Sequence, residues 1–319
     1  MGEIKTIGVL TSGGDAPGMN AAIRAIVRTA IASGLNVKGI MRGYAGLLNE
    51  EIIDMDKQSV SEIMRRGGTI LYTARCKEFM TEEGQQKAAE ILKKHGIDGL
   101  IVIGGDGSFR GAQKLSALGI NTIGIPGTID LDIACTDYTI GFDTAVNIAV
   151  EAIDRIADTS EAHSCFSVVE VMGRRAGFIA LWSGIAGSAR AIFADSNTTA
   201  EQIVDHLRKY HFTSGTIVLA EGAGKAEPIA EIIERELHVH TRANVLAFIQ
   251  RGGNPTAKDR VYGSMMGAYA VDLIKEGKNH HLVCVKHDEL CGVEISEGMK
   301  QTKECSAYLA HLGRTLSCI

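Results

Sequence analysis

The chain contains few prolines and few aromatic residues: among 319 residues there are four prolines, one tryptophan and 5% aromatics in total. It also lacks a low-complexity linker and a repeat of fixed period. Its 45% hydrophobic residues, 22% charged residues and 37 glycines are typical of a soluble α/β protein with many tight turns, and exclude a disordered or fibrous chain. With so few prolines, domain boundaries leave little trace in the sequence.

No pair of cysteines has the Cys-x-x-Cys spacing of a metal or redox motif, and the cysteine count is odd. We therefore predict reduced thiols. No segment approaches about 18 uninterrupted apolar residues, and the N-terminus lacks the charged and long apolar regions of a signal peptide. A cytoplasmic protein with no membrane partner is expected, and a net charge of −5 gives no case for nucleic acid. The seven cysteines are Cys76, Cys135, Cys165, Cys284, Cys291, Cys305 and Cys318.

Apolar runs rich in valine and isoleucine recur along the chain, and helical patterns follow them. This alternation predicts an α/β fold with a largely parallel sheet. The pattern predicts helices opened by Thr81, ending at Gly96, and by Thr199, because both threonines precede acidic residues and an apolar face. At this length two domains are preferred, with a boundary near residues 141–144. The predicted strands are 6–10, 37–40, 99–103, 122–125, 167–171, 216–219 and 244–249.

A glycine-rich loop, residues 11–20, follows the first predicted strand and precedes a helix. Backbone N–H groups of such a loop can surround a nucleotide phosphate. A glycine-rich turn without a ligand is the alternative. A dinucleotide-dependent dehydrogenase is disfavoured, because no Gly-x-Gly-x-x-Gly with a downstream acid follows this strand.

Asp106 lies among the glycines of residues 104–108, directly after a predicted strand. An aspartate beside an anion site would repel phosphate, so its presence there needs another explanation. We interpret Asp106 as a ligand of Mg²⁺, and the ion would bridge phosphate oxygens. The alternative is an aspartate that caps the following helix.

Asp130 follows another strand and is close in sequence to Thr128 and Asp132. In a kinase that acts on an alcohol, a carboxylate must accept the hydroxyl proton, and Asp130 fits this role. Asp132 would assist the metal or orient Thr128, and the alternative is an Asx turn at a strand end.

Further polar residues follow apolar segments elsewhere in the chain. The guanidinium groups of Arg75 and Arg174 suit phosphate and developing charge, although either could be a solvated surface residue. Glu221 could accept sugar hydroxyl groups, and Arg251 adds a cation after the last predicted strand. Together these residues indicate phosphoryl transfer.

The ordered motifs at residues 11–20, 104–108, 126–130, 169–174 and 250–257 resemble those of the bacterial 6-phosphofructokinase family, nearly from end to end. The resemblance implies two Rossmann-like three-layer domains. Residues 1–141 plus about 252–304 would bind ATP, and residues 142–251 plus about 305–319 would bind the sugar phosphate. It also implies MgATP-dependent phosphorylation of the 1-hydroxyl of fructose 6-phosphate in glycolysis, by a cytoplasmic allosteric homotetramer whose active sites borrow residues across a subunit interface.

The resemblance assigns roles by position. Asp130 would be the base, with Thr128, Arg174 and Arg75 as further catalytic residues, and Asp106 would face Mg²⁺. Gly107 and Gly127 resemble the ATP-using members, because bulkier residues at those points would occupy the space of an α-phosphate. The ATP site would comprise Gly14, Arg75, Cys76, Gly105, Asp106, Gly107 and Ser108. The sugar-phosphate site would comprise Thr128, Ile129, Asp130, Met172, Gly173, Arg174, Glu221, Arg242, Phe248 and Arg251.

Four positions depart from the family pattern. Leu131 replaces an asparagine beside the base, Cys165 an arginine supplied by a neighbouring subunit, Phe178 an aspartate and Phe248 a histidine. Loss of the arginine and the histidine removes charge-assisted bonds of about 1.5–3 kcal/mol each, a weakening of ~10²-fold or more for fructose 6-phosphate. Two alternatives stay open: a kinase for a different sugar phosphate, and a regulatory or partner subunit with weak catalysis.

The effector site is also altered. Arg24 and Arg28 match basic residues of the family's nucleotide effector pocket, but Ala157 stands where the family has an arginine. The loop around residues 213–215 is shortened as well. We therefore predict weak or absent regulation by ADP and phosphoenolpyruvate.

Overall fold

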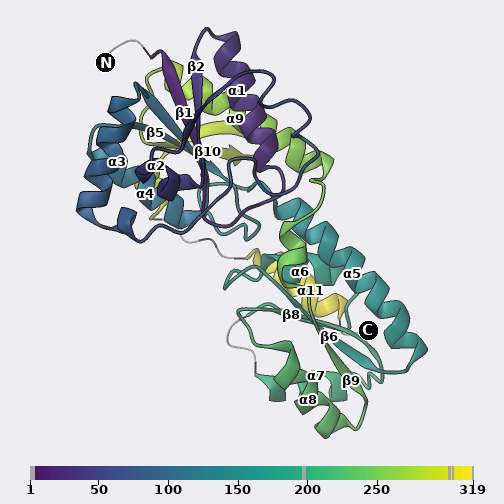
Figure 1. Ribbon diagram of the computed structural model, residues 1–319. Coiled ribbons are helices and arrows are strands. Elements are labelled where there is room, and N and C mark those ends of the chain that lie inside the picture. The colour runs from purple at the N-terminus through teal and green to yellow at the C-terminus, as the bar shows by residue number, and fades with distance from the viewer. Residues whose placement is uncertain (1–3, 196–198, 301–302, 304, 318–319) are drawn as a thin grey trace. The chain divides into compact units, whose positions relative to one another are not determined.

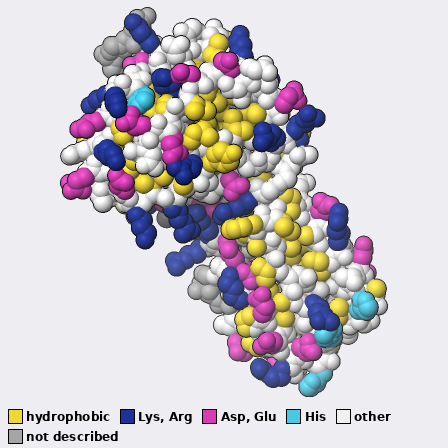
Figure 2. Space-filling view, in the orientation of Figure 1, with side chains coloured by type: hydrophobic (Ala, Val, Ile, Leu, Met, Phe, Trp, Pro, Cys, Tyr) yellow, Lys and Arg dark blue, Asp and Glu magenta, His cyan; other side chains and the backbone are white. Residues whose placement is uncertain are grey.

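The computed structural model describes residues 4–195, 199–300, 303 and 305–317 (Figure 1). The chain divides into two compact units. Unit 1 comprises Met1–Ile129, Ile133–Asp143 and Arg251–Thr302, and unit 2 comprises Asp130–Asp132, Thr144–Gln250 and Lys303–Ile319. Basic and acidic side chains are both present over each unit on the face shown in Figure 2.

A seven-stranded sheet forms the centre of unit 1, in the order β11-β10-β5-β4-β1-β2-β3. The three middle strands are buried along their whole length, as strands covered on both faces must be. Five strands are parallel: β1 (Thr6–Ser12), β2 (Asn36–Ile40), β4 (Gly99–Gly104), β5 (Asn121–Pro126) and β10 (His281–Lys286). The edge strands β3 (Ile52–Met55) and β11 (Glu289–Glu294) are antiparallel to their neighbours.

Helices cover both faces of this sheet (Figure 1). One face carries α2 (Gly43–Leu48), α3 (Glu82–Lys94) and α4 (Asp106–Ala117), which share one apolar core with the strands. The other carries α1 (Met19–Ala32) and α9 (Ala257–Lys275). These two helices lie so close that a Cβ at Gly267 would stand 2.5 Å from the backbone oxygen of Ala22. The short elements η1 (Glu78–Met80) and α10 (Ile295–Gly298) complete unit 1.

Unit 2 contains a four-stranded parallel sheet in the order β7-β8-β6-β9. Its strands are β6 (Phe166–Val171), β7 (Ala191–Phe193), β8 (Gly215–Ala220) and β9 (Thr241–Val245). Helices α7 (Ala200–Lys209) and α8 (Ala226–Leu237) pack on one face through a single apolar core. Most of α5 (Phe142–Ala162), with α6 (Phe178–Ala186) and α11 (Ala307–Leu316), lies on the other (Figure 1).

The two predicted helix starts are confirmed. The Thr81 side chain accepts a hydrogen bond from the Gly84 N–H, and the Thr199 side chain accepts one from the Gln202 N–H. The prediction of a strand over 244–249 is wrong. The strand ends at Val245, and the 3₁₀ helix η2 (Ala247–Arg251) follows. Phe248 and Ile249 of η2 are apolar but exposed, so the apolar run that suggested a strand does not mark residues of the sheet.

Six cysteines lie among the described residues and none of these six forms a disulfide, whereas Cys318 lies outside the described residues. Within the described part of the chain, no helix has both the length and the apolar character that crossing a membrane requires.

Candidate functional site

The carboxyl ends of β1, β4 and β5 lie side by side at one edge of the unit 1 sheet, because Ser12 pairs with Gly104 and Gly104 with Pro126. The loops that follow these strands therefore start from neighbouring positions. Ligands bind at this edge in open parallel sheets. The structure thus brings the predicted phosphate-binding segments together.

The loop after β1 is held by side chains from later segments. The Ser108 hydroxyl donates to the Ser12 backbone oxygen at 2.9 Å, and a Cβ at Gly14 would lie 3.2 Å from the Arg251 guanidinium. The loop ends at Gly18, whose φ of 104° and close approach to Ile140 only glycine tolerates. Arg251, predicted for the sugar phosphate, thus lies in unit 1 against the predicted ATP loop.

Asp106 is the first residue of α4, and the N-cap is Gly105, so the carboxylate does not cap the helix. The Arg110 Nε donates to Asp106 Oδ2 at 3.0 Å, and the side chain is 39% exposed. A Cβ at Gly107 would meet nothing within 4 Å, which leaves open space beside this carboxylate.

This arrangement fits Mg²⁺ that arrives with a polyphosphate. Magnesium keeps several waters and takes only one or two carboxylates besides phosphate oxygens. Within the described residues no group of three or more His, Cys, Asp or Glu side chains could hold a metal ion by itself. Asp106 is therefore suited to a metal–nucleotide complex and not to a preformed metal centre.

The role of Gly127 in leaving room for an α-phosphate stays a prediction. A Cβ there would lie 2.9 Å from Ile103 Cγ2 and 3.1 Å from Met19 Cε, so a larger residue would require these side chains to shift. The open space described above lies at Gly107.

Sequence analysis did not find Tyr44, a buried residue of α2. Its hydroxyl donates to the Ser108 backbone oxygen at 2.7 Å, and its ring stacks on Phe79 with 3.9 Å between centroids. Burial raises the pKa of Tyr44, so the phenol remains a donor. Tyr44 thereby fixes the start of α4.

The two remaining residues of the predicted ATP site, Arg75 and Cys76, lie in a loop. Arg75 is exposed and Cys76 packs against the core.

Unit 2 contains the second group of predicted residues, centred on Asp130. This carboxylate is 3% exposed, and its Oδ2 lies 3.2 Å from the Nε of Arg174. The same guanidinium reaches Asp132, with 3.8 Å between Nη1 and Oδ2. The predicted base and the predicted phosphate-binding arginine are therefore an ion pair.

The segment Met172–Arg174, directly after β6, is held by a side chain that follows β8 and by one from η2. Glu221 Oε1 accepts hydrogen bonds from the Gly173 N–H at 3.2 Å and the Arg174 N–H at 2.8 Å. Gln250, which sequence analysis placed in the motif 250–257 without a role, accepts one from the Met172 N–H at 2.8 Å. Since Arg174 has a φ of 49°, these bonds hold a backbone conformation that non-glycine residues seldom adopt.

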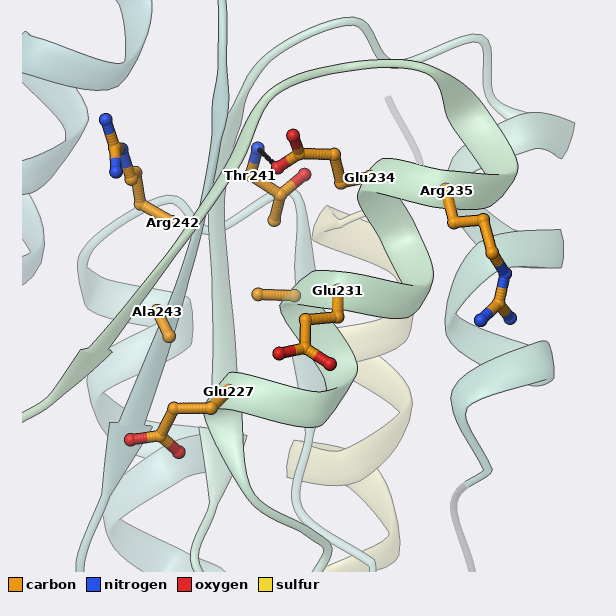
Figure 3. A pocket seen from close by; sticks show the side chains of 8 residues that line it. Glu227, Glu231, Glu234, Arg235, Thr241, Arg242 and Ala243 are labelled. Atoms are coloured by element: carbon orange, nitrogen blue, oxygen red, sulfur yellow. Dashed lines mark hydrogen bonds between the residues drawn. The ribbon is translucent and has the colours of Figure 1, made fainter.

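One predicted sugar-phosphate residue, Arg242, is not brought to this edge. It pairs with Ser167 near the start of β6, whereas Met172 and Glu221 follow the carboxyl ends of β6 and β8. Cys165 is buried at the same start. Figure 3 shows Arg242 on β9 beside a cavity of about 560 Å³ that acidic residues of α8 also line. Within one chain, Arg242 therefore lies at the amino ends of the parallel strands, whereas Glu221 lies at their carboxyl ends.

Four further positions that sequence analysis singled out lie elsewhere in the two units. Leu131 is buried and has a left-handed φ of 55°, and Phe178 is buried as the first residue of α6. Arg24 and Arg28 lie about one turn apart on α1, and the weak or absent effector regulation stays a prediction.

Comparison with known proteins extends the resemblance over the chain. A family model for phosphofructokinase matches residues 6–274. The ATP-dependent 6-phosphofructokinases of Clostridium botulinum (strain Loch Maree, type A3) and Clostridium acetobutylicum are each 52% identical, over 98% of this chain and 100% of their own length. The solved phosphofructokinase from Saccharomyces cerevisiae has a TM-score of 0.87 at 33% identity, and the match covers 98% of this chain and 48% of the yeast chain.

Proposed function

Because the chain belongs to the phosphofructokinase family, we propose that it transfers a phosphoryl group from ATP to the 1-hydroxyl of fructose 6-phosphate, giving fructose 1,6-bisphosphate and ADP. The observation that carries the chemistry is the ion pair between buried Asp130 and Arg174 at 3.2 Å. It supplies, at the ends of parallel strands, a base for the hydroxyl proton and a cation for the transferring charge.

In the proposed reaction Asp130 accepts the proton from the attacking hydroxyl as the oxygen–phosphorus bond forms. Arg174 and Arg75 offset the negative charge that spreads over the transferring group. Thr128 and Ile129 lead into Asp130 from β5, and Thr128 lies next to Gly105, 3.8 Å from the position of a Cβ there.

ATP would bind through unit 1. The proposed contacts are Gly14, Arg75, Cys76 and the segment 105–108, which starts at the strand ends described above. Asp106 would hold Mg²⁺, which neutralises phosphate charge when it is bound.

The sugar phosphate would bind at Met172, Gly173, Glu221 and Phe248 of unit 2, and Arg251 is a further contact that the family resemblance implies. Since Arg242 lies at the amino ends of the strands and this site at their carboxyl ends, Arg242 can serve the site only from a second copy of the chain. The homotetramer with shared active-site residues, which the family resemblance implies, is therefore part of the proposal.

The test is an ADP-release assay with MgATP and a panel of sugar phosphates. Turnover on fructose 6-phosphate above the other acceptors supports the proposal. Faster turnover on another sugar phosphate replaces the acceptor but keeps the kinase. ATP binding without turnover on any acceptor favours a regulatory or partner subunit.

Glu221→Ala is expected to lower kcat by at least about tenfold, because the backbone of Gly173 and Arg174 loses its acceptor and Arg174 leaves Asp130. Glu221→Gln keeps an oxygen that can accept these two hydrogen bonds. Its fold-decrease in kcat should be less than half of that in Glu221→Ala. Steady-state rates with both substrates varied separate the two variants. An equal loss of kcat in both would show that the charge of Glu221 matters and its support of the loop does not.

A further inference from the structure

A cavity of about 190 Å³ lies at the carboxyl ends of β6, β8 and β9, and its lining includes Glu170, Met172, Glu221, Lys225, Val245 and Phe248. In the order β7-β8-β6-β9 the connections lead to one side of β6 and then to the other, so this cavity lies at the switch point of the sheet. Ligands of open parallel sheets bind at such points.

The carboxylates of the cavity are already bound. Glu170 is 5% exposed, and its two oxygens accept hydrogen bonds from the Lys225 Nζ at 2.7 Å and the Ala226 N–H at 2.9 Å. Glu221 uses one oxygen for the loop that carries Arg174. Its second oxygen can accept a sugar hydroxyl.

Among the described residues that line this cavity, Lys225 is the one with a basic side chain. The ammonium group forms an ion pair with Glu170, while 62% of the lysine side chain is exposed. The hydrogen bond to Glu170 raises the pKa of Lys225, so the ammonium stays charged. An ammonium carries three N–H donors, and the bond to Glu170 uses one of them.

We propose that Lys225 binds the phosphate group of the acceptor sugar phosphate, a specificity-determining role that rests on the proposed function. The chain has Cys165 and Phe248 at the two positions where the family resemblance implies basic residues. Lys225 places a cation in the lining of the same cavity as Phe248. Lysine binds phosphate as a compact charge with rotatable donors.

Lys225→Met is expected to raise the KM for fructose 6-phosphate by about 10- to 100-fold, the effect of one charged hydrogen bond. The kcat and the KM for ATP should stay within about twofold. Lys225→Arg should recover most of the loss. Lys209→Met, on α7 and outside the cavity lining, is the matched control and should behave as wild type.

A purely structural role for Lys225 predicts a different pattern, because Lys225→Met also leaves the buried Glu170 without its cation. The double variant Glu170→Gln/Lys225→Met removes both charges and retains an acceptor for the Ala226 N–H. If Lys225 only neutralises Glu170, the double variant regains the wild-type KM for fructose 6-phosphate, and the proposal is overturned. If Lys225 binds the phosphate, the KM remains raised.

Binding measurements separate this proposal from the proposed function. Thermal melting is followed with fructose 6-phosphate and, separately, with fructose, which lacks the phosphate. Absence of turnover in the wild type would refute the proposed function alone. Lys225 is supported if fructose 6-phosphate raises the melting temperature of the wild type, fructose does not, and the double variant loses the rise. No rise in the wild type, or an equal rise in the double variant, overturns the role of Lys225.

Discussion

Asp130→Asn is expected to lower kcat by about 10²- to 10⁴-fold, because an amide cannot accept the proton of the attacking hydroxyl. The asparagine has the same shape and keeps an oxygen within reach of the Arg174 Nε, which lies 3.2 Å from the carboxylate in the wild type. In the proposed function ATP binds through residues of unit 1, so the KM for ATP should change by less than about twofold.

The measurement is ADP release at saturating MgATP and fructose 6-phosphate, with thermal melting to establish that the variant is folded. Asp205→Asn on the surface of α7 is the control and should keep the wild-type rate. A kcat above about one tenth of the wild-type value would rule out Asp130 as the base, since removal of a general base costs more than that.

The positions of the site residues along the chain could be predicted because they follow apolar strands. Parallel strands that share a sheet bring their carboxyl ends to one edge, so Gly14, Asp106 and Thr128 had to lie near one another. The contacts that hold the site could not be predicted. Gln250 supports Met172 from 78 positions away, and no periodicity or propensity carries that information.

The hairpin of β10 and β11 shows a second limit. Its two-residue turn, His287 and Asp288, has φ values of 52° and 63°, the left-handed pair of a type I′ turn. Asn-Gly is the usual sequence signal for that turn, and His-Asp lacks the glycine. Histidine and aspartate adopt positive φ more readily than most residues, so they permit this turn but signal it more weakly than Asn-Gly does. The pairing of the strands, which includes Cys284 opposite Cys291, supplies the rest of its support.

Leu131 shows how a substitution visible in the sequence gains meaning from the backbone. Its φ of 55° lies in the left-handed region, which asparagine adopts far more readily than leucine. The family resemblance places asparagine there, so this chain has a leucine in a conformation that the asparagine of the family pattern would adopt more readily. The strain falls on the residue between Asp130 and Asp132.

Asp259→Ala is expected to lower the free energy of unfolding by about 4 kcal/mol, through two buried donors that lose their acceptor at about 1–3 kcal/mol each. The Asp259 side chain is fully buried in the first turn of α9, and its Oδ1 accepts hydrogen bonds from the Tyr138 hydroxyl and the Gly141 N–H. For a unit of this size the loss corresponds to a melting temperature lower by about 8–16 °C.

Matched phenylalanine variants test whether burial causes the effect. Tyr138→Phe removes one donor and leaves Gly141 paired, so we expect a loss of about 1 kcal/mol. Tyr262→Phe removes a hydrogen bond to Asp288 at the surface and should lower the melting temperature by less than about 2 °C. Melting followed by circular dichroism measures all three variants. If Asp259→Ala melts within about 2 °C of the wild type, the hydrogen bonds of the buried carboxylate do not stabilise the segment that leads from β5 through Asp130 to Gly141. The packing of its apolar residues must then stabilise that segment.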